Sequence, residues 1–233
     1  MSANQSFGAR PEAACASPLA PAALFQLFFQ PGRFFSRMDG LGRFPQALLV
    51  AWFCGLALSV GKIDERMARA EAGHPSAAWH QIAPWLLESW PHYWLLVLAA
   101  GTLGAVALWY FGGWIFRVRL NICGVVCADK RAARVANVYQ EFVYASAVLM
   151  TAVVQTGLFA DYKSTWEAMP PWAGLPLVFA FWSCWTSYCA AVSGFAARRG
   201  KALVWFLMLP ALSYAVTFGL AMAVLLPTTG ASA

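Results

Sequence analysis

The chain has 233 residues, of which 61% are hydrophobic and only 11% are charged, and its formal net charge is +6. Soluble domains carry about 25% charged residues, so this composition excludes an ordinary soluble protein and indicates a membrane protein. A single membrane-spanning domain of this length leaves little chain for a second, soluble domain.

The N-terminal region precedes the first stretch that is long enough to cross a membrane. Residues 1–22 are rich in Ala, Pro and Ser and are predicted to form a disordered cytoplasmic tail without the apolar core of a signal peptide. Residues 23–43 mix aromatic residues such as Phe28 and Phe29 with Arg33, and Pro31 interrupts them. This pattern favours an amphipathic segment in the membrane interface, and the alternative is a segment packed against the helix bundle.

Five apolar stretches are each about 20 residues long, the length of helix that crosses the hydrocarbon core. They cover residues 44–63, 92–116, 142–159, 172–195 and 202–226. The predicted fold class is therefore all-α, a polytopic five-helix transmembrane bundle at residues 44–227, followed by a short outer tail at 228–233. Asp129 is expected to cap the helix that continues into the third span.

The basic residues lie mainly in every second connection between these stretches. Twelve of the 16 Lys and Arg residues precede the first span, separate the second from the third, or separate the fourth from the fifth. The positive-inside rule then predicts a cytoplasmic N-terminus and an outer C-terminus. The expected partners are anionic lipid head groups on the cytoplasmic side, to which each Lys or Arg contributes about 1 kcal/mol. Nucleic acid is not needed to explain the charge.

The longest connection, residues 62–91, is predicted to lie on the outer side. Its apolar residues, such as Ile63, Met67 and Trp79, recur at helical spacing. Pro75 and Ser76 mark a break between two short helices.

Small residues recur at intervals of three or four within the spans, where they allow helix backbones to approach closely. The predicted helix-packing positions are Gly101, Gly104, Ser183, Ala215 and Gly219. We expect these faces to pack inside the bundle rather than to form a dimer.

Polar residues within the spans are few. Gln155, Thr151 and Ser187 define a possible polar cavity, although such side chains more often bond to neighbouring backbone. No ionisable residue is expected at mid-membrane depth, which argues against a pump. Glu141 is interpreted as a residue at the membrane interface, paired with the nearby Arg134.

Metal and cofactor sites are not predicted. His74, His80 and His92 share the outer loop, but their spacings match no metal-ligand motif. Cys123 and Cys127 form one weak pair where zinc sites need two. The chain has no phosphate-binding glycine loop and no catalytic constellation, so we expect a protein that is not an enzyme and holds no cofactor.

Several short segments, taken in order, resemble a known family. They are residues 30–35 (QPGRFF), 110–114 (YFGGW), 121–124 (NICG), 144–145 (YA), Trp166, and 182–188 (WSCWTSY). Together they resemble the Ypt-interacting protein (YIP) family of membrane proteins in its bacterial form, over about residues 24–226. The sequence departs from the family at Ser146 and the two residues after it, where a proline is common. The resemblance implies five spans with an outer C-terminus.

The functional prediction is a non-enzymatic scaffold, membrane-organising or complex-assembly factor, since buried charge is absent and packing faces are abundant. The alternative is a small permease or lipid-handling transporter that uses a polar cavity among the helices. A membrane protein partner is expected for the scaffold. The localisation is predicted to be a bacterial cytoplasmic (inner) membrane, because no organelle-targeting extension is evident.

Overall fold

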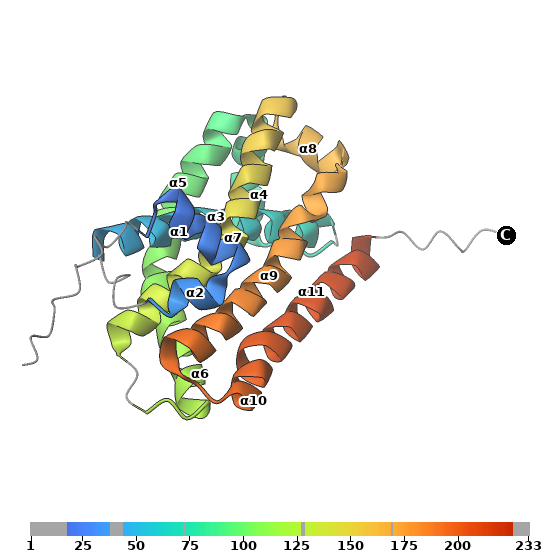
Figure 1. Ribbon diagram of the computed structural model, residues 1–233. Helices are drawn as coiled ribbons and strands as arrows, with labels where there is room; N and C mark the ends of the chain where they lie inside the picture. Colours follow the sequence, from blue (N-terminus) through green and yellow to red (C-terminus); the bar gives the residue numbers. More distant parts are fainter. Residues whose placement is uncertain (1–17, 38–43, 72, 127–128, 169, 226–233) are drawn as a thin grey trace, which may run out of the picture.

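The computed structural model describes residues 18–37, 44–71, 73–126, 129–168 and 170–225, and within these ranges all regular structure is helical (Figure 1). Five helices are long and apolar enough to cross a membrane. They are Pro45–Glu71, Trp90–Ile122, Lys130–Leu158, Leu175–Gly194 and Arg199–Gly219. The protein is thus a helical integral membrane protein, as its composition predicts.

Several of these spans are built from more than one helical segment. The spanning elements are α3 (Phe44–Glu71), α5 (Trp90–Ala107) with η2 (Leu108–Gly112) and α6 (Gly113–Ile122), α7 (Lys130–Leu158), α9 (Leu175–Cys189) with η4 (Ala190–Gly194), and α10 (Arg199–Ala202) with η5 (Leu203–Met208) and α11 (Leu209–Leu225). The shorter elements are α1 (Pro21–Phe29), α2 (Pro31–Phe35), α4 (Ala77–Glu88), α8 (Tyr162–Ala168) and the 3₁₀ turn η3 (Pro171–Gly174). Segments η2, η4 and η5 are π-helical.

The bundle has two distinct ends. We call the end where α6 stops and α7 and α10 begin the basic end, because Lys130, Arg131, Arg198 and Arg199 lie there. The opposite end carries the helix α8 (Figure 1), which the last turns of α3 and the helix α4 contact, and we call it the distal end. The sequence therefore places most of its positive charge at one end of the helices, whereas Lys62, Arg66, Arg69 and Lys163 lie toward the other.

The first helix extends further than its apolar stretch. It continues to Glu71 rather than stopping at residue 63, and Glu65 pairs with Lys62 and Arg69 on its polar turns. Pairs of opposite charge three and four residues apart stabilise such solvated turns. The predicted outer loop therefore contains one separate helix, α4, whose first turn is capped by the Ser76 side chain.

Helix α7 is the longest element, and it is continuous from the basic end to the distal end. The Asp129 carboxylate accepts hydrogen bonds from the backbone amides of Arg131 and Ala132 at 3.1 and 3.2 Å, which confirms the predicted cap. The cap satisfies amides that have no partner within the helix. The third span thus begins twelve residues before the apolar stretch that predicted it.

Helix α3 lies between α5 and α7, and α7 also packs against α6 and α9. The α3–α5 contact is close because glycines face each other. A Cβ atom on Gly55 would lie 2.2 Å from the carbonyl oxygen of Gly101, and one on Gly104 would lie 3.2 Å from that of Gly55. Gly101 and Gly104, two of the predicted packing positions, therefore bring two backbones into direct contact.

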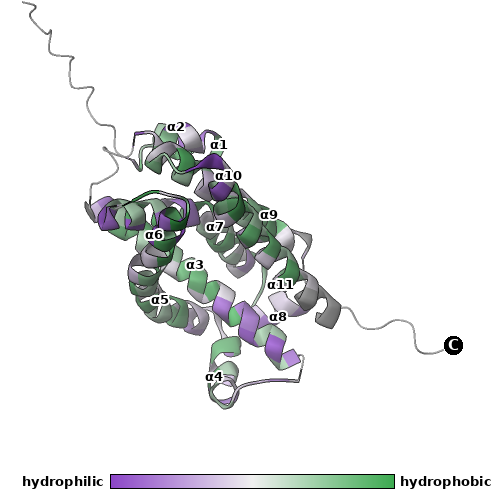
Figure 2. Ribbon diagram, turned by 90° about the horizontal axis from the view of Figure 1, so that it is seen from below, coloured by the Kyte–Doolittle hydropathy of each residue, from purple (hydrophilic) through white to green (hydrophobic). Residues whose placement is uncertain are grey.

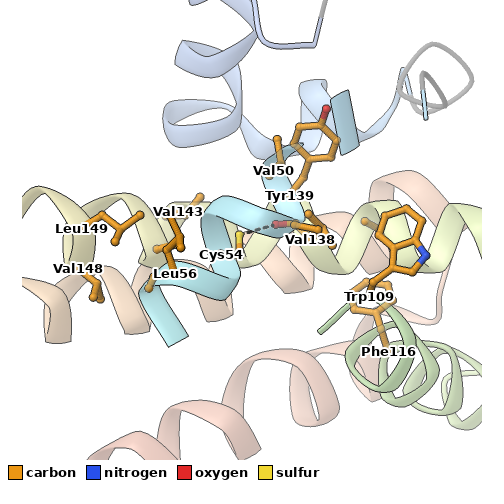
Figure 3. Close-up of a cluster of buried hydrophobic side chains, with 14 of the residues drawn as sticks. Val50, Cys54, Leu56, Trp109, Phe116, Val138, Tyr139, Val143, Val148 and Leu149 are labelled. Carbon is orange, nitrogen blue, oxygen red and sulfur yellow. Dashed lines mark hydrogen bonds between the residues drawn. The ribbon is translucent and has the colours of Figure 1, made fainter. Parts of the chain in front are cut away.

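The contact between α3 and α7 is a continuous apolar layer. Val50 and Leu56 of α3 lie opposite Val138 and Val143 of α7, with Trp109 and Phe116 of the second span beside them (Figure 3). The Cys54 thiol donates a hydrogen bond to the Val138 carbonyl oxygen, and its Sγ lies 3.6 Å from that oxygen. This layer holds the first three spans together.

The segment that the sequence favours as interfacial packs against the bundle. Leu27 and Phe35 are fully buried, Phe34 packs on Tyr139 of α7, and the indole of Trp182 donates a 2.8 Å hydrogen bond to the Phe28 carbonyl. The structure therefore agrees with the alternative, a segment packed against the bundle, because apolar side chains of α1 and α2 pack on α7 and α9. Phe25 and Phe29 remain exposed on the other face, and residues 38–43 lie outside the described part.

The distal end is closed by side chains that meet across large sequence separations. We call Trp90, Tyr93, Trp94, Tyr162 and Trp166 the aromatic cluster. Tyr93 and Trp166 stack on Tyr162, with the Tyr93 and Tyr162 centroids 5.0 Å apart, and Trp90 and Trp94 pack edge to face on Tyr93. The hydroxyl of Tyr162 donates to the Asp64 carboxylate at 2.5 Å, and the indole of Trp166 donates to Glu71 at 2.6 Å. Burial, with Asp64 beside it, raises the pKa of Tyr162 well above its usual value, so its hydroxyl stays a donor.

Two further indole hydrogen bonds extend this closure to the end of α7. Trp90 donates to the carbonyl of Phe159 at 2.8 Å, and Trp94 donates to the hydroxyl of Thr156 at 3.0 Å. Aromatic rings with one polar atom suit this membrane boundary. The cluster therefore fixes α8 and the ends of α3, α5 and α7 to one another.

The last span lies at the edge of the bundle, against α9 (Figure 1). Ala215 and Gly219 are exposed, and a Cβ atom on Gly219 would meet no atom within 4 Å. The expectation that this face packs inside the bundle is wrong for the described residues, because α11 packs on α9 through other positions. Apolar residues nevertheless dominate α11, as expected for a helix that faces lipid (Figure 2).

Candidate functional site

A cavity of about 340 Å³ lies between the second, third, fourth and fifth spans. Its polar side is formed by α6, α7 and α9, and its more apolar side by η5 and α11. The lining residues are Arg119, Gln140, Glu141, Ser183, Cys184, Ser187, Trp205, Phe206, Leu209, Pro210, Ser213 and Tyr214. Ligand pockets of this size hold small organic groups.

Glu141 places a carboxylate in this cavity. It lies 11 residues after the first residue of α7, which corresponds to about 16 Å along the helix. One carboxylate oxygen accepts a 2.8 Å hydrogen bond from the side-chain amide of Gln140, which is itself only 6% exposed. A carboxylate within a spanning helix is costly to bury, so it normally marks a functional site.

Arg119 supplies the opposite charge. It lies three residues before the end of α6, lines the same cavity, and attracts the Glu141 carboxylate. A guanidinium offers several N–H donors in a fixed plane, which suits carboxylate or phosphate oxygens. The cavity therefore presents one cationic and one anionic group to whatever occupies it.

Further polar groups of the cavity come from α9, besides Ser213 and Tyr214 of α11. Ser183 and Ser187 are nearly fully buried, and the Ser183 hydroxyl donates to the carbonyl of Ala180 at 2.8 Å. Thr186 on the same helix likewise donates to Trp182. The Ser183 and Thr186 hydroxyls thus make the backbone bonds expected of such residues within a span, while their oxygens can still accept.

The structure places the predicted cavity residues in two different regions. Ser187 lines the cavity, whereas Thr151 and Gln155 do not. They lie 10 and 14 residues beyond Glu141 on α7, about 15 and 21 Å further toward the distal end. The polar cavity is thus nearer to the basic end than the sequence indicates.

The predicted Glu141–Arg134 pair is replaced by other contacts. Glu141 faces the cavity with Gln140 and Arg119, whereas the Arg134 guanidinium lies 4.8 Å from the ring centroid of Tyr110. The sequence predicts no ionisable residue at mid-membrane depth and assigns Glu141 to the interface. In the structure Glu141 lies 11 residues after the start of the 29-residue spanning helix α7, nearer to its middle than to either end. Hydropathy alone sets the start of the third apolar stretch at residue 142, so Glu141 was assigned to the membrane interface.

The histidines and cysteines occupy separate places. Within the described ranges, no three His, Cys, Asp or Glu side chains converge on a point where a metal ion could bind. His92 stacks on Trp85 and bonds to its carbonyl at 3.0 Å. Cys123 is buried, which raises the pKa of its thiol, while Cys127 lies outside the described residues.

The sequence interpretation missed Arg119, Cys184 and Tyr214 as cavity residues. Arg119 follows the apolar stretch that ends at residue 116, and it was assigned to a loop. The only signal in the sequence was its helical spacing: Arg119 follows Ile115 and Phe116 by four and three residues, so one helix can continue through all three.

Comparison with protein-family models, with curated proteins and with solved structures finds no match to this chain. The resemblance to the YIP family stays a prediction, and the class defined by the fold is a five-span helical integral membrane protein.

Proposed function

We propose that the protein is a small permease or lipid-handling transporter, without enzymatic activity, that binds a zwitterionic group in the cavity between α6, α7, α9 and α11. The observation that carries this proposal is the pair Glu141 and Arg119, two opposite charges lining one cavity within the spans. A scaffold has no need of such a pair, since buried charge lowers stability unless it is paired and used.

The ligand class follows from the two charges and the wall opposite them. An ammonium group matches Glu141, and a phosphate or carboxylate matches Arg119. Trp205 and Leu209 supply an apolar wall on the lipid-facing side of the cavity. Phosphatidylethanolamine, which carries an ammonium, a phosphate and acyl chains, combines these features.

The basic end is proposed to face the cytoplasm, with the C-terminus outside, because Lys and Arg concentrate there. The membrane is proposed to be a bacterial inner membrane. In this orientation the cavity opens in the cytoplasmic half of the bilayer, since Glu141 is nearer to the start of α7 than to its end.

The test is lipid movement between leaflets. The full chain is reconstituted in liposomes that contain phosphatidylethanolamine with an acyl-chain fluorophore, and external dithionite reports how fast inner-leaflet label becomes accessible. Glu141→Gln and Arg119→Gln are each expected to slow this rate about tenfold, the effect of losing one charge-assisted contact. Glu88→Gln, an exposed position at the end of α4, is the matched control and should match the wild type. Equal rates with and without protein would contradict the proposal.

A scaffold that binds a membrane protein partner is the second candidate, and one observation favours it. Ala215 and Gly219 leave a strip of small side chains uncovered on α11, and such strips admit a second helix at close range. Affinity isolation in mild detergent followed by mass spectrometry tests it. A stoichiometric protein partner that is lost on Ala215→Leu supports the scaffold.

A further inference from the structure

A second pocket, of about 240 Å³, lies at the basic end between the second and third spans. Its lining residues are Tyr110, Gly113, Trp114, Arg117, Lys130 and Arg134. It shares no residue with the cavity around Glu141, so an inference about it does not depend on the proposed function. Half of its lining residues are cationic.

The pocket is built by a close approach of α6 and α7. A Cβ atom on Gly113 would lie 2.4 Å from Cγ of Arg134 and 3.0 Å from its Cα, so only glycine leaves room for this arginine. The guanidinium of Arg134 lies 4.8 Å from the ring centroid of Tyr110. A guanidinium stacked on a ring directs its N–H groups sideways, where oxygen atoms can accept them.

The charge of the pocket is uniformly positive. No Asp or Glu is among its lining residues. The acidic residue next to it in the chain, Asp129, already accepts hydrogen bonds from the backbone amides of Arg131 and Ala132 as the cap of α7. Three cations within one small pocket repel one another, and an anion between them relieves that repulsion.

The depth of the pocket matches the head-group layer. Lys130 is the first residue of α7, and Arg117 lies five residues, or about 7 Å, before the end of α6. Tyr110 and Trp114 are 58% and 57% exposed on the side away from the bundle. Exposed Tyr and Trp next to basic residues are typical of a membrane boundary, where the ring contacts the chain and glycerol region of a lipid.

We propose that this pocket binds the phosphate of an anionic phospholipid, such as phosphatidylglycerol, through Arg117, Lys130 and Arg134. The two arginines contact phosphate oxygens with their planar N–H groups, and Lys130 adds a point charge from the solvent side. Tyr110 and Trp114 contact the lipid below its phosphate. Basic pockets between spanning helices at the cytoplasmic surface bind lipid head groups in this way.

The test measures lipid binding to the purified full chain in mild detergent, with native mass spectrometry counting bound phosphatidylglycerol against added phosphatidylcholine. Lys130→Gln and Arg117→Gln are each expected to weaken phosphatidylglycerol binding about fivefold, the share of one interfacial basic residue. Arg131→Gln is the matched control, because it removes the same charge from the same turn of α7 without lining the pocket. The affinity of the Arg131→Gln variant for phosphatidylglycerol should stay within about twofold of the wild-type affinity.

Lys130→Gln is the decisive variant, because Lys130 is exposed at the start of α7 and its replacement leaves the core intact. Equal losses in Lys130→Gln and Arg131→Gln would overturn the proposal, since they would show a diffuse charge effect. A second arm adds inorganic phosphate alone. Displacement of the lipid by millimolar phosphate would overturn the proposal that the ligand is a phospholipid. Retention of the lipid would support that proposal.

Discussion

The two ends of the bundle are built on opposite principles. At the distal end, Tyr162 and Trp166 donate hydrogen bonds to the carboxylates of Asp64 and Glu71, and stacked rings fill the space between helices. At the basic end, charged residues such as Glu141 and Arg134 line two pockets. The distal end uses these polar groups to join helices, whereas the basic end, where Lys201 also bonds to the Ile122 carbonyl, presents several polar groups to two pockets.

The same contrast appears across the bundle. Of the most apolar part of Pro45–Glu71, 56% is buried, against 11% for Arg199–Gly219. Helix α3, packed between α5 and α7, therefore holds a frame of three spans together, while the last span covers one side of the cavity beside Glu141. A rigid frame with a lightly held wall suits a protein that admits a ligand from the membrane.

The largest expected effect comes from a substitution at the close contact between α3 and α5. Gly55→Ala places a Cβ atom 2.2 Å from one backbone atom and 2.5 Å from another on α5, so the helices must separate, at a cost of about 3 kcal/mol. Gly61→Ala on the same helix meets no atom within 4 Å and should be neutral or stabilise by up to about 1 kcal/mol. Thermal unfolding in mild detergent compares them. Similar melting temperatures for the two variants would show that the α3–α5 contact is not tight.

A smaller effect tests the distal end alone. Tyr162→Phe removes the hydroxyl that donates to Asp64 and leaves a partly buried carboxylate without this donor, at a cost of about 1–3 kcal/mol. The pair is measured by a double-mutant cycle of thermal unfolding with Asp64→Asn. A coupling energy near zero would mean that the hydrogen bond does not hold α8 to α3.

The stability of the distal end is expected to depend on pH through the Asp161 carboxylate. The amide of Ser164 donates to the Asp161 carboxylate at 2.7 Å and lowers the pKa of that residue. This stabilisation is present above the unfolded pKa of about 4 and is lost as the pH falls through the lower folded value. Asp161→Asn keeps a cap but has no charge, so melting curves between about pH 3 and pH 5 should lose part of their slope. An unchanged slope would assign the acid sensitivity to other carboxylates.

The smallest expected effect concerns the lightly held wall. Ala215→Leu adds a large side chain to an exposed position on α11 and should change stability by less than about 0.5 kcal/mol. Thermal unfolding and the oligomeric mass in detergent are measured together. A clear loss of stability or of an oligomer would show that this face is covered by another helix, which would favour the scaffold.

The architecture follows from the sequence because apolar length is a strong and local signal. The five apolar stretches appear as five spans, and Asp129 as a cap could be recognised from its position before a charged and then apolar run. The bounds were less predictable. Helix α3 reaches Glu71 and α6 reaches Ile122, since pairs of opposite charge and snorkelling side chains continue a helix beyond its apolar core.

The site could be predicted only in part, because its residues come from separate spans. Ser187 was recognised as a cavity residue, and Glu141 was singled out with the wrong neighbour. Arg119 lies 22 residues before Glu141, and hydropathy gives no information about which helix faces which. The aromatic cluster depends on a still longer separation, 98 residues between Asp64 and Tyr162, and no local pattern encodes it.

The three π-helical segments of the described chain have a consequence for how this protein can vary in length. All of them, η2, η4 and η5, lie in the half of the bundle nearer the basic end. A π turn accommodates one residue more than an α turn, so single insertions and deletions are absorbed there by widening or narrowing the turn. Homologous chains can therefore gain or lose a residue around the pockets while the aromatic cluster keeps its alignment, and lineages can diversify at one end without rebuilding the other.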